Sequence, residues 1–231
     1  MKNAIAPVTL RLPRRPRSVL DPTNGRVRPP SPTNGDGSGD CRAPEPSFPA
    51  PAAARIAMLV FLAAETMLFA GFIAAFLVFR LGAPVWPPPF QPRLPLGTTG
   101  LNTLVLLASS LTMRGAVQAG RAADRRGFVT GLGATAALGA AFLALQGSEW
   151  ARLVAFGLTA ASGVYGGLFY VLIGAHGAHV LGALGWLAGL AARATAARVA
   201  EPVVAHAAVF ALYWYFVVVL WPVLYVLVYV V

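Results

Sequence analysis

Five uninterrupted apolar runs constrain this chain more than any other feature of its sequence. The runs cover residues 56–79, 96–113, 128–146, 163–192 and 203–231. At about 1.5 Å of rise per helical residue, such runs match the ~30 Å hydrocarbon core of a bilayer. They are continuous rather than built from the alternating ten-residue segments of a membrane barrel, so they predict helices. The predicted fold class is an all-α membrane protein with a bundle of five transmembrane helices.

The first 54 residues differ in kind from the rest of the chain. They are rich in Pro, Gly, Ser, Asn and Arg, and they contain the single cysteine, Cys41, which therefore has no partner for an internal disulfide. A segment that buries so little apolar surface does not offset its loss of conformational entropy. We therefore expect two parts: a disordered basic tail at 1–54 and a membrane domain at 55–231.

The charge distribution predicts how the helices cross the membrane. A net charge of +10 could indicate a nucleic-acid partner, but nine of the 18 Lys and Arg residues lie in the first 55 positions. With the N-terminus in the cytoplasm, 15 of the 18 basic residues fall on the cytoplasmic side. We therefore expect a cytoplasmic N-terminus, a periplasmic C-terminus and no nucleic-acid partner. The strong preference for Arg over Lys is typical of a GC-rich bacterium, so the predicted location is the inner (plasma) membrane.

Glu65 is the only acidic residue inside one of the apolar runs. A bare carboxylate within hydrocarbon is costly, so this side chain is expected to be either protonated or paired. One hypothesis gives Glu65 a function in handling protons or contacting lipid. The alternative is a protonated acid that only holds a neighbouring helix.

Two histidines, His176 and His179, stand three residues apart in the fourth run and are expected to share a helix face. Such a pair can begin a metal site, but a complete site needs further ligands. The only other histidine is His206, near the start of the last run, so the three are expected at different depths. No metal site is predicted, and the pair is interpreted as structural or lipid-contacting.

Other polar and aromatic residues are expected to hold the bundle together. Asn102 opens the second run and is predicted to bond across helices. Gln146 and Glu149 flank the outer end of the third run beside Trp150, which is typical of a helix end with an interfacial anchor. Trp214 falls in the middle of the last run, so it is expected to pack against another helix or a bound lipid.

Small residues recur at four-residue spacing in two of the runs. Such stripes let helix backbones approach closely, although they can also reflect composition alone. The two stripes are Gly131, Thr135 and Gly139 in the third run, and Gly174, Ala178 and Gly182 in the fourth.

Taken in order, five motifs resemble those of the haem–copper oxidase subunit III family. The first is Glu65-Thr-Met-Leu-Phe-Ala-Gly-Phe with the turn that starts at Trp86. The others are Leu101-Asn102-Thr103, Leu145-Gln146-Gly-Ser-Glu149-Trp150, Gly174-Ala-His176-Gly-Ala-His179-Val and Tyr213-Trp-Tyr-Phe-Val217 with Trp221. Each motif is weak alone, but together they extend over residues 56–231.

The resemblance implies a non-catalytic subunit of a respiratory terminal oxidase of the cytochrome c oxidase type. It implies that this chain binds no haem or copper, which reside in partner subunits, and that it packs on catalytic subunit I. It also implies bound phospholipid and support for proton uptake and for the stability of the catalytic subunit. On this resemblance Glu65 takes the family's intramembrane carboxylate position, His176 and His179 its paired histidines, and Trp86 its turn tryptophan.

Departures from the family pattern leave alternatives open. Longer members have seven helices, and this chain lacks the first two. In the last run Tyr215 stands where a histidine is usual and Val218 where an aspartate is usual. One alternative is a divergent subunit III-like protein associated with nitric oxide reductase. Another is a small proton-coupled membrane transporter that uses Glu65 as its proton site.

Overall fold

The computed structural model describes residues 50–86, 96–196 and 201–230. The predicted tail therefore lies almost wholly outside the described residues. The helices are α1 (Ala50–Gly82), α2 (Leu96–Arg121), α3 (Arg125–Ala155), α4 (Val164–Ala196) and α5 (Glu201–Tyr225), the last continued by the π-helical turn η1 (Val226–Val230). All five are long and apolar enough to cross a membrane, and the described residues form no strand. The predicted five-helix membrane bundle is confirmed.

Most of the helices extend beyond the apolar runs that predict them. α2 continues past the run's end at residue 113 to Arg121, and α3 continues past residue 146 to Ala155. Hydropathy marks where hydrocarbon ends, whereas a helix ends where its backbone is capped. The N-cap of α3 is Asp124, whose carboxylate accepts a hydrogen bond from the Gly127 amide at 3.1 Å. At its other end α3 continues to Ala155, well beyond the apolar run that predicts it.

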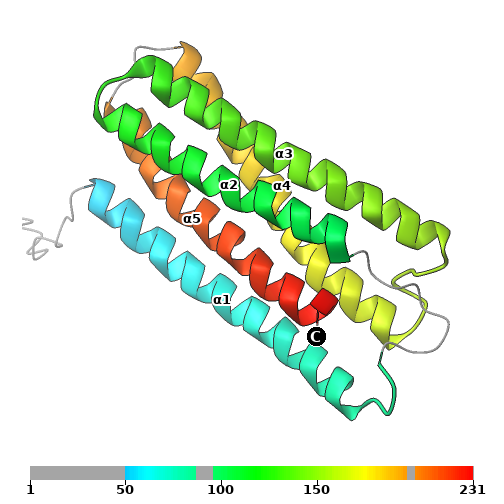
Figure 1. Cartoon of the computed structure of the whole chain (residues 1–231). Helices are drawn as coiled ribbons and strands as arrows, with labels where there is room; N and C mark the ends of the chain where they lie inside the picture. The colour runs from blue at the N-terminus through cyan, green and yellow to red at the C-terminus, as the bar shows by residue number, and fades with distance from the viewer. Residues whose placement is uncertain (1–49, 87–95, 197–200, 231) are drawn as a thin grey trace, which may run out of the picture. The chain divides into compact units, whose positions relative to one another are not determined.

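The helices of the unit formed by residues 48–231 run side by side (Figure 1). α5 occupies the interior, since 44% of its apolar stretch is buried, against 11% for α1. Trp214 of α5 is fully buried, and its indole N–H donates to Ser109 of α2 at 3.1 Å. The expectation that Trp214 packs against another helix is confirmed.

The small-residue stripe of α3 lies where helices approach most closely. A Cβ added at Gly131 would stand 2.7 Å from Cβ of Ala116 on α2, and one at Gly139 would stand 2.7 Å from the Trp214 ring. The stripe of α4 behaves differently. Gly182 has open space beside it, and a Cβ added at Gly174 would meet the Trp150 ring only at an ordinary contact distance of 3.7 Å, so this stripe does not mark a close approach of helices.

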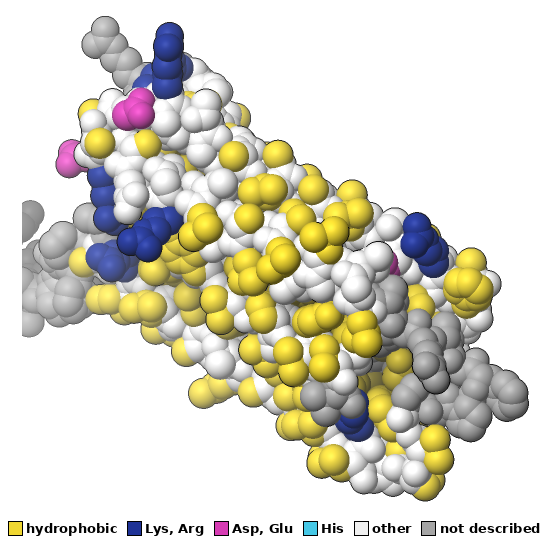
Figure 2. All heavy atoms as spheres, in the orientation of Figure 1, with side chains coloured by type: hydrophobic (Ala, Val, Ile, Leu, Met, Phe, Trp, Pro, Cys, Tyr) yellow, Lys and Arg dark blue, Asp and Glu magenta, His cyan; other side chains and the backbone are white. Residues whose placement is uncertain are grey.

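The outer surface of the bundle matches a bilayer. Figure 2 shows hydrophobic side chains along the length of the helices, with Arg side chains gathered toward the two ends. Apolar side chains on α1 are especially exposed, including Leu59 at 57% and Met67 at 77%. Since lipid or another subunit must cover this surface, α1 presents the bundle's least protected face.

Candidate functional site: an intramembrane carboxylate–imidazole pair

Glu65 of α1 meets His179 of α4 near the middle of both helices. Oε2 of Glu65 and Nε2 of His179 lie 2.9 Å apart. The other ring nitrogen, Nδ1 of His179, lies 2.7 Å from the carbonyl oxygen of Ala175, one turn earlier in α4. The structure thus provides the partner that a carboxyl group at this depth needs.

The hydrogen bonds around His179 determine how many protons the pair holds. A carbonyl oxygen only accepts, so Nδ1 carries a hydrogen and donates it to Ala175. The contact between Nε2 and Glu65 then needs one further proton. Either a protonated Glu65 donates to a neutral imidazole, or an imidazolium donates to a carboxylate. The pair therefore shares one proton between its two members.

The pair lies on the rim of the bundle rather than in its core. The side chains of Glu65 and His179 are 14% and 20% exposed. Phe69 packs edge-on against the imidazole, with ring centroids 5.1 Å apart. Tyr213 of α5 donates a hydrogen bond to the carbonyl oxygen of His179 at 3.4 Å. One side of the pair is thus held by protein, and the other remains partly exposed at the surface of the bundle.

His176 is not part of this pair, although it lies only three residues from His179. It is fully buried and packs between Phe142 and Trp221, whose ring centroids are 6.1 and 5.0 Å from its own. Neither of its ring nitrogens has a hydrogen-bond partner in the described part of the chain. Residues three apart on a helix differ by about 60° in direction, which is enough for two neighbours to face different helices. The two histidines were expected to share a helix face, and the structure gives them different neighbours.

Glu149 forms a second polar cluster, and it lies within α3 rather than at the helix end that the sequence indicates. Glu149 is only 5% exposed, so it is not an interfacial anchor at a helix end. Its carboxylate accepts hydrogen bonds from the hydroxyls of Thr98 at 2.7 Å and Thr99 at 2.9 Å, both on α2. Gln146 donates to it at 3.3 Å and also to the hydroxyl of Tyr229 in η1 at 3.1 Å. Because α3 continues beyond Trp150, these residues lie inside the bundle and join three elements.

The remaining predicted residues hold helices together. The side-chain amide of Asn102 donates to the carbonyl oxygen of Phe142 on α3 at 3.1 Å, which confirms the predicted bond between helices. Trp86, just after α1, packs edge-on against Phe76 and Tyr165, with centroids 5.7 and 5.0 Å away. It also borders a cavity of about 410 Å³. The proline run that follows Trp86 lies outside the described residues.

Metal-ligating side chains do not converge in the described ranges. No three His, Cys, Asp or Glu residues among them are close enough to hold one ion. The imidazole of His179 is already bonded through both nitrogens, and that of His176 faces aromatic rings. Cys41 lies outside the described residues.

Some members of the polar cluster could not be found from sequence. Tyr229 stands in a run of apolar residues near the C-terminus, where a tyrosine is typical of the membrane interface. The available signal was the three-residue spacing of Gln146 and Glu149, which places both on one helix face. That spacing indicates a shared partner but does not identify it.

Five helices of the described residues that are long and apolar enough to cross a membrane, packed around a mostly apolar core, characterise a multi-pass helical membrane protein. The family profile for cytochrome c oxidase subunit III matches residues 48–231. The chain belongs to the cytochrome c oxidase subunit III family, and the resemblance seen in its motifs is confirmed. Membership places it in the respiratory chain, in a complex with other oxidase subunits.

Relatives from distant organisms share most of the membrane domain. Cytochrome c oxidase subunit 3 of Synechocystis sp. is 38% identical over 174 residues, which cover 74% of this chain and 73% of the relative. The protein of the same name from Corynebacterium diphtheriae is 32% identical over 202 residues, covering 85% and 98%. That of Sus scrofa is 35% identical over 182 residues, covering 76% and 68%.

Proposed function

We propose that this chain is the non-catalytic subunit III of a haem–copper terminal oxidase in a bacterial plasma membrane. In this proposal it packs on catalytic subunit I, and haem and copper are held by partner subunits. The N-terminal tail lies in the cytoplasm and the C-terminus in the periplasm, as the positive-inside rule favours. The exposed apolar face of α1 supports the need for a neighbouring subunit or ordered lipid.

The observation that carries the functional part of the proposal is the contact between Glu65 and His179. Two groups that share one proton can accept or release it with a small movement of hydrogen. Their partial exposure on the rim leaves room for a phospholipid headgroup or a water molecule beside them. We infer that the pair supports proton uptake by the catalytic subunit and protects it during turnover.

Purification of the full chain under mild conditions tests the proposal. A tagged chain expressed in its own cells should bring down haem-containing subunits, recognised by their reduced-minus-oxidised absorption spectrum, together with oxygen-consuming activity. The matched control carries Glu65→Gln, which should retain the same haem recovery. Isolation of the chain alone, without any haem protein, would contradict the proposal. If the purified material consumed nitric oxide rather than oxygen, the chain would instead be assigned to a nitric oxide reductase complex.

A further inference from the structure

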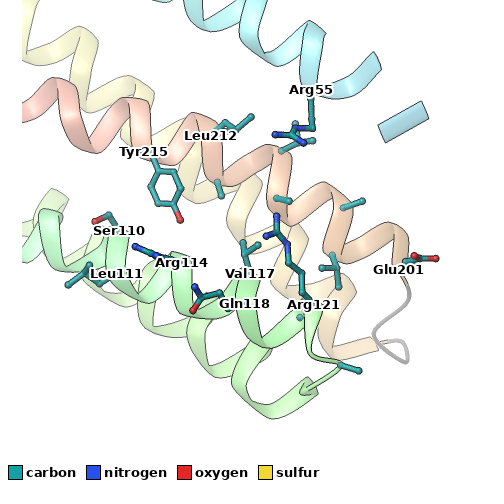
Figure 3. A pocket seen from close by; sticks show the side chains of 17 residues that line it. Arg55, Ser110, Leu111, Arg114, Val117, Gln118, Arg121, Glu201, Leu212 and Tyr215 are labelled. Atoms are coloured by element: carbon teal, nitrogen blue, oxygen red, sulfur yellow. The ribbon is translucent and has the colours of Figure 1, made fainter. Parts of the chain in front are cut away.

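A cationic cleft lies at one end of the bundle, between α1, α2 and α5. It is open and measures about 1090 Å³, close to the upper end of the roughly 300–1,000 Å³ that small-molecule sites occupy. Three arginines line it: Arg55 of α1, and Arg114 and Arg121 of α2 (Figure 3). Glu201, at the start of α5, is the one acidic residue among the described residues of its lining. The charged lining is therefore positive by two.

The arginines extend outward from the ends of the apolar runs. Arg55 directly precedes the run at 56–79, and Arg114 directly follows the run at 96–113. Arg121 comes two helical turns after Arg114, so it lies on the same face of α2 and roughly 10 Å farther toward the end of the bundle. The cationic side chains thus begin at the boundary of the hydrocarbon and continue beyond it, where a water-soluble ligand has access.

Two contacts with α5 set the register of the cleft's walls. Trp214 donates to Ser109 of the antiparallel α2, and Tyr213 packs on Phe61 of the parallel α1. Counted along the helices from these contacts, Arg55 and the first arginine of α2 lie at nearly the same depth. The two guanidinium groups therefore reach the cleft from different walls.

The three arginines of the cleft have no partner within the described part of the chain. None of them takes part in a hydrogen bond or ion pair there, whereas Arg125 nearby donates to the carbonyl oxygen of Thr195 at 2.8 Å. Arg114 and Arg121 both lie close enough to Tyr215 to interact electrostatically with its phenol group. In Figure 3 the ring of Tyr215 points from α5 toward Arg114. Guanidinium and phenol groups arranged in this way can donate several hydrogen bonds to one anion.

The charge and the spread of these groups determine which anion fits. A guanidinium fork binds two phosphate oxygens at once, so phosphate suits the site better than a halide. A single phosphate group is too short to contact both Arg114 and Arg121, whose positions on α2 are roughly 10 Å apart. An anion with linked phosphate groups carries several negative charges along an extended chain. Such an anion matches both the positive lining and the row of guanidinium groups.

We propose that this cleft binds a soluble anion with linked phosphate groups, a class that includes inorganic polyphosphate and nucleoside triphosphates. Its phosphates lie between Arg55 and Arg114 and continue to Arg121, and Tyr215 donates to a phosphate oxygen. The bound anion joins α1 to α2. Because α1 is the helix with the least buried apolar stretch and also carries Glu65, the anion restrains the helix on which the pair with His179 depends.

Titration of the full chain, together with its co-purifying subunits, with tripolyphosphate tests this site. The protein is held in phosphatidylcholine nanodiscs without divalent cations, and binding is measured by calorimetry. Arg114→Gln with Arg121→Gln should weaken binding by at least roughly tenfold, the effect of losing one charge-assisted hydrogen bond. The matched control, Arg126→Gln with Arg193→Gln, removes two exposed arginines at the same end of the bundle but outside the cleft. It should bind like the unmodified protein.

A second variant and a shorter anion sharpen the test. Glu201→Gln removes the acidic side chain from the lining and should tighten the binding of tripolyphosphate several-fold. Inorganic phosphate should bind at least roughly tenfold more weakly than tripolyphosphate, since it reaches fewer guanidinium groups. Equal affinity for the two anions, or equal weakening in the control variant, would overturn the proposal.

Further arms of the titration distinguish the sources of the phosphate chain from other occupants. Tighter binding of ATP than of tripolyphosphate would support a nucleotide, and equal or weaker binding would support inorganic polyphosphate. Loss of tripolyphosphate binding when the nanodiscs contain phosphatidylglycerol would assign the cleft to lipid and overturn the proposal. In preparations with haem subunits, binding that appears only after their removal would overturn it too, by assigning the cleft to a protein interface.

The anion site does not rest on the proposed oxidase role. Calorimetry reports the cleft whether or not haem proteins accompany the chain. Failure of one proposal therefore leaves the other intact.

Discussion

Glu149 and Glu65 are both carboxyl groups inside a membrane bundle, yet their surroundings are opposite. Glu149 is enclosed by α2, α3 and η1 and receives hydrogen bonds from two threonines and a glutamine. Glu65 meets a single imidazole on the rim between α1 and α4 and remains partly exposed. A carboxylate that is saturated by fixed donors has little freedom to exchange a proton. Glu65, which meets an imidazole on the partly exposed rim, is the acid to which we assign a role in proton handling, whereas the contacts of Glu149 hold the bundle together.

The helices that carry the two acids differ in the same way. α2 and α3 approach closely through Gly131, and buried bonds from the α5 tryptophans reach Ser109 and Thr103 of α2. α1 buries far less of its apolar stretch than α5. The firmly packed side of the bundle holds Glu149, and the less protected side holds Glu65. The chain therefore keeps its rigid polar network apart from the face where another subunit or lipid must bind.

Replacement of Glu149 should have the largest effect on stability. Glu149→Ala removes the acceptor of three hydrogen bonds inside the bundle, and we expect a loss of about 2–3 kcal/mol in the free energy of unfolding. Glu65→Ala, on the rim, should cost about 1 kcal/mol or less. Unfolding of the purified full chain in mixed micelles, followed by circular dichroism, compares the two variants. Equal losses would remove the distinction between a structural and a functional acid.

A smaller and sharper test concerns the close contact between α2 and α3. Gly131→Ala would place a methyl group 2.7 Å from Cβ of Ala116 and 2.9 Å from its Cα, so we expect overpacking to cost about 1–3 kcal/mol. Gly133→Ala lies on the same helix with open space around it and should be neutral or slightly stabilising. The same unfolding assay measures both variants. Similar behaviour of the two would show that α3 is not held at this distance from α2.

The sequence predicted the helices well because each is marked by a long apolar run. It could not predict their full lengths, since α3 begins at its N-cap Asp124 and ends at the turn after residue 155, both beyond the apolar run. Glu65 stood out because a lone acid in an apolar run is chemically expensive. The partner of Glu65 could not be identified, because His176 and His179 have the same sequence signal. Only tertiary packing turns His179 toward α1 and His176 into the core. The same limit applies to Glu149, whose burial depends on Thr98 and Tyr229, far away in sequence.

The account depends most on the proton shared by Glu65 and His179. Its most direct test is the Glu65→Gln variant of the intact complex, followed through prolonged turnover. The glutamine amide can still donate to Nε2 of His179, so the contact and the recovery of haem subunits should be retained while the shared proton is lost. We predict slower proton uptake and several-fold fewer turnovers before inactivation than in the unmodified complex. Unchanged proton uptake and an unchanged turnover lifetime, at full haem content, would contradict the account.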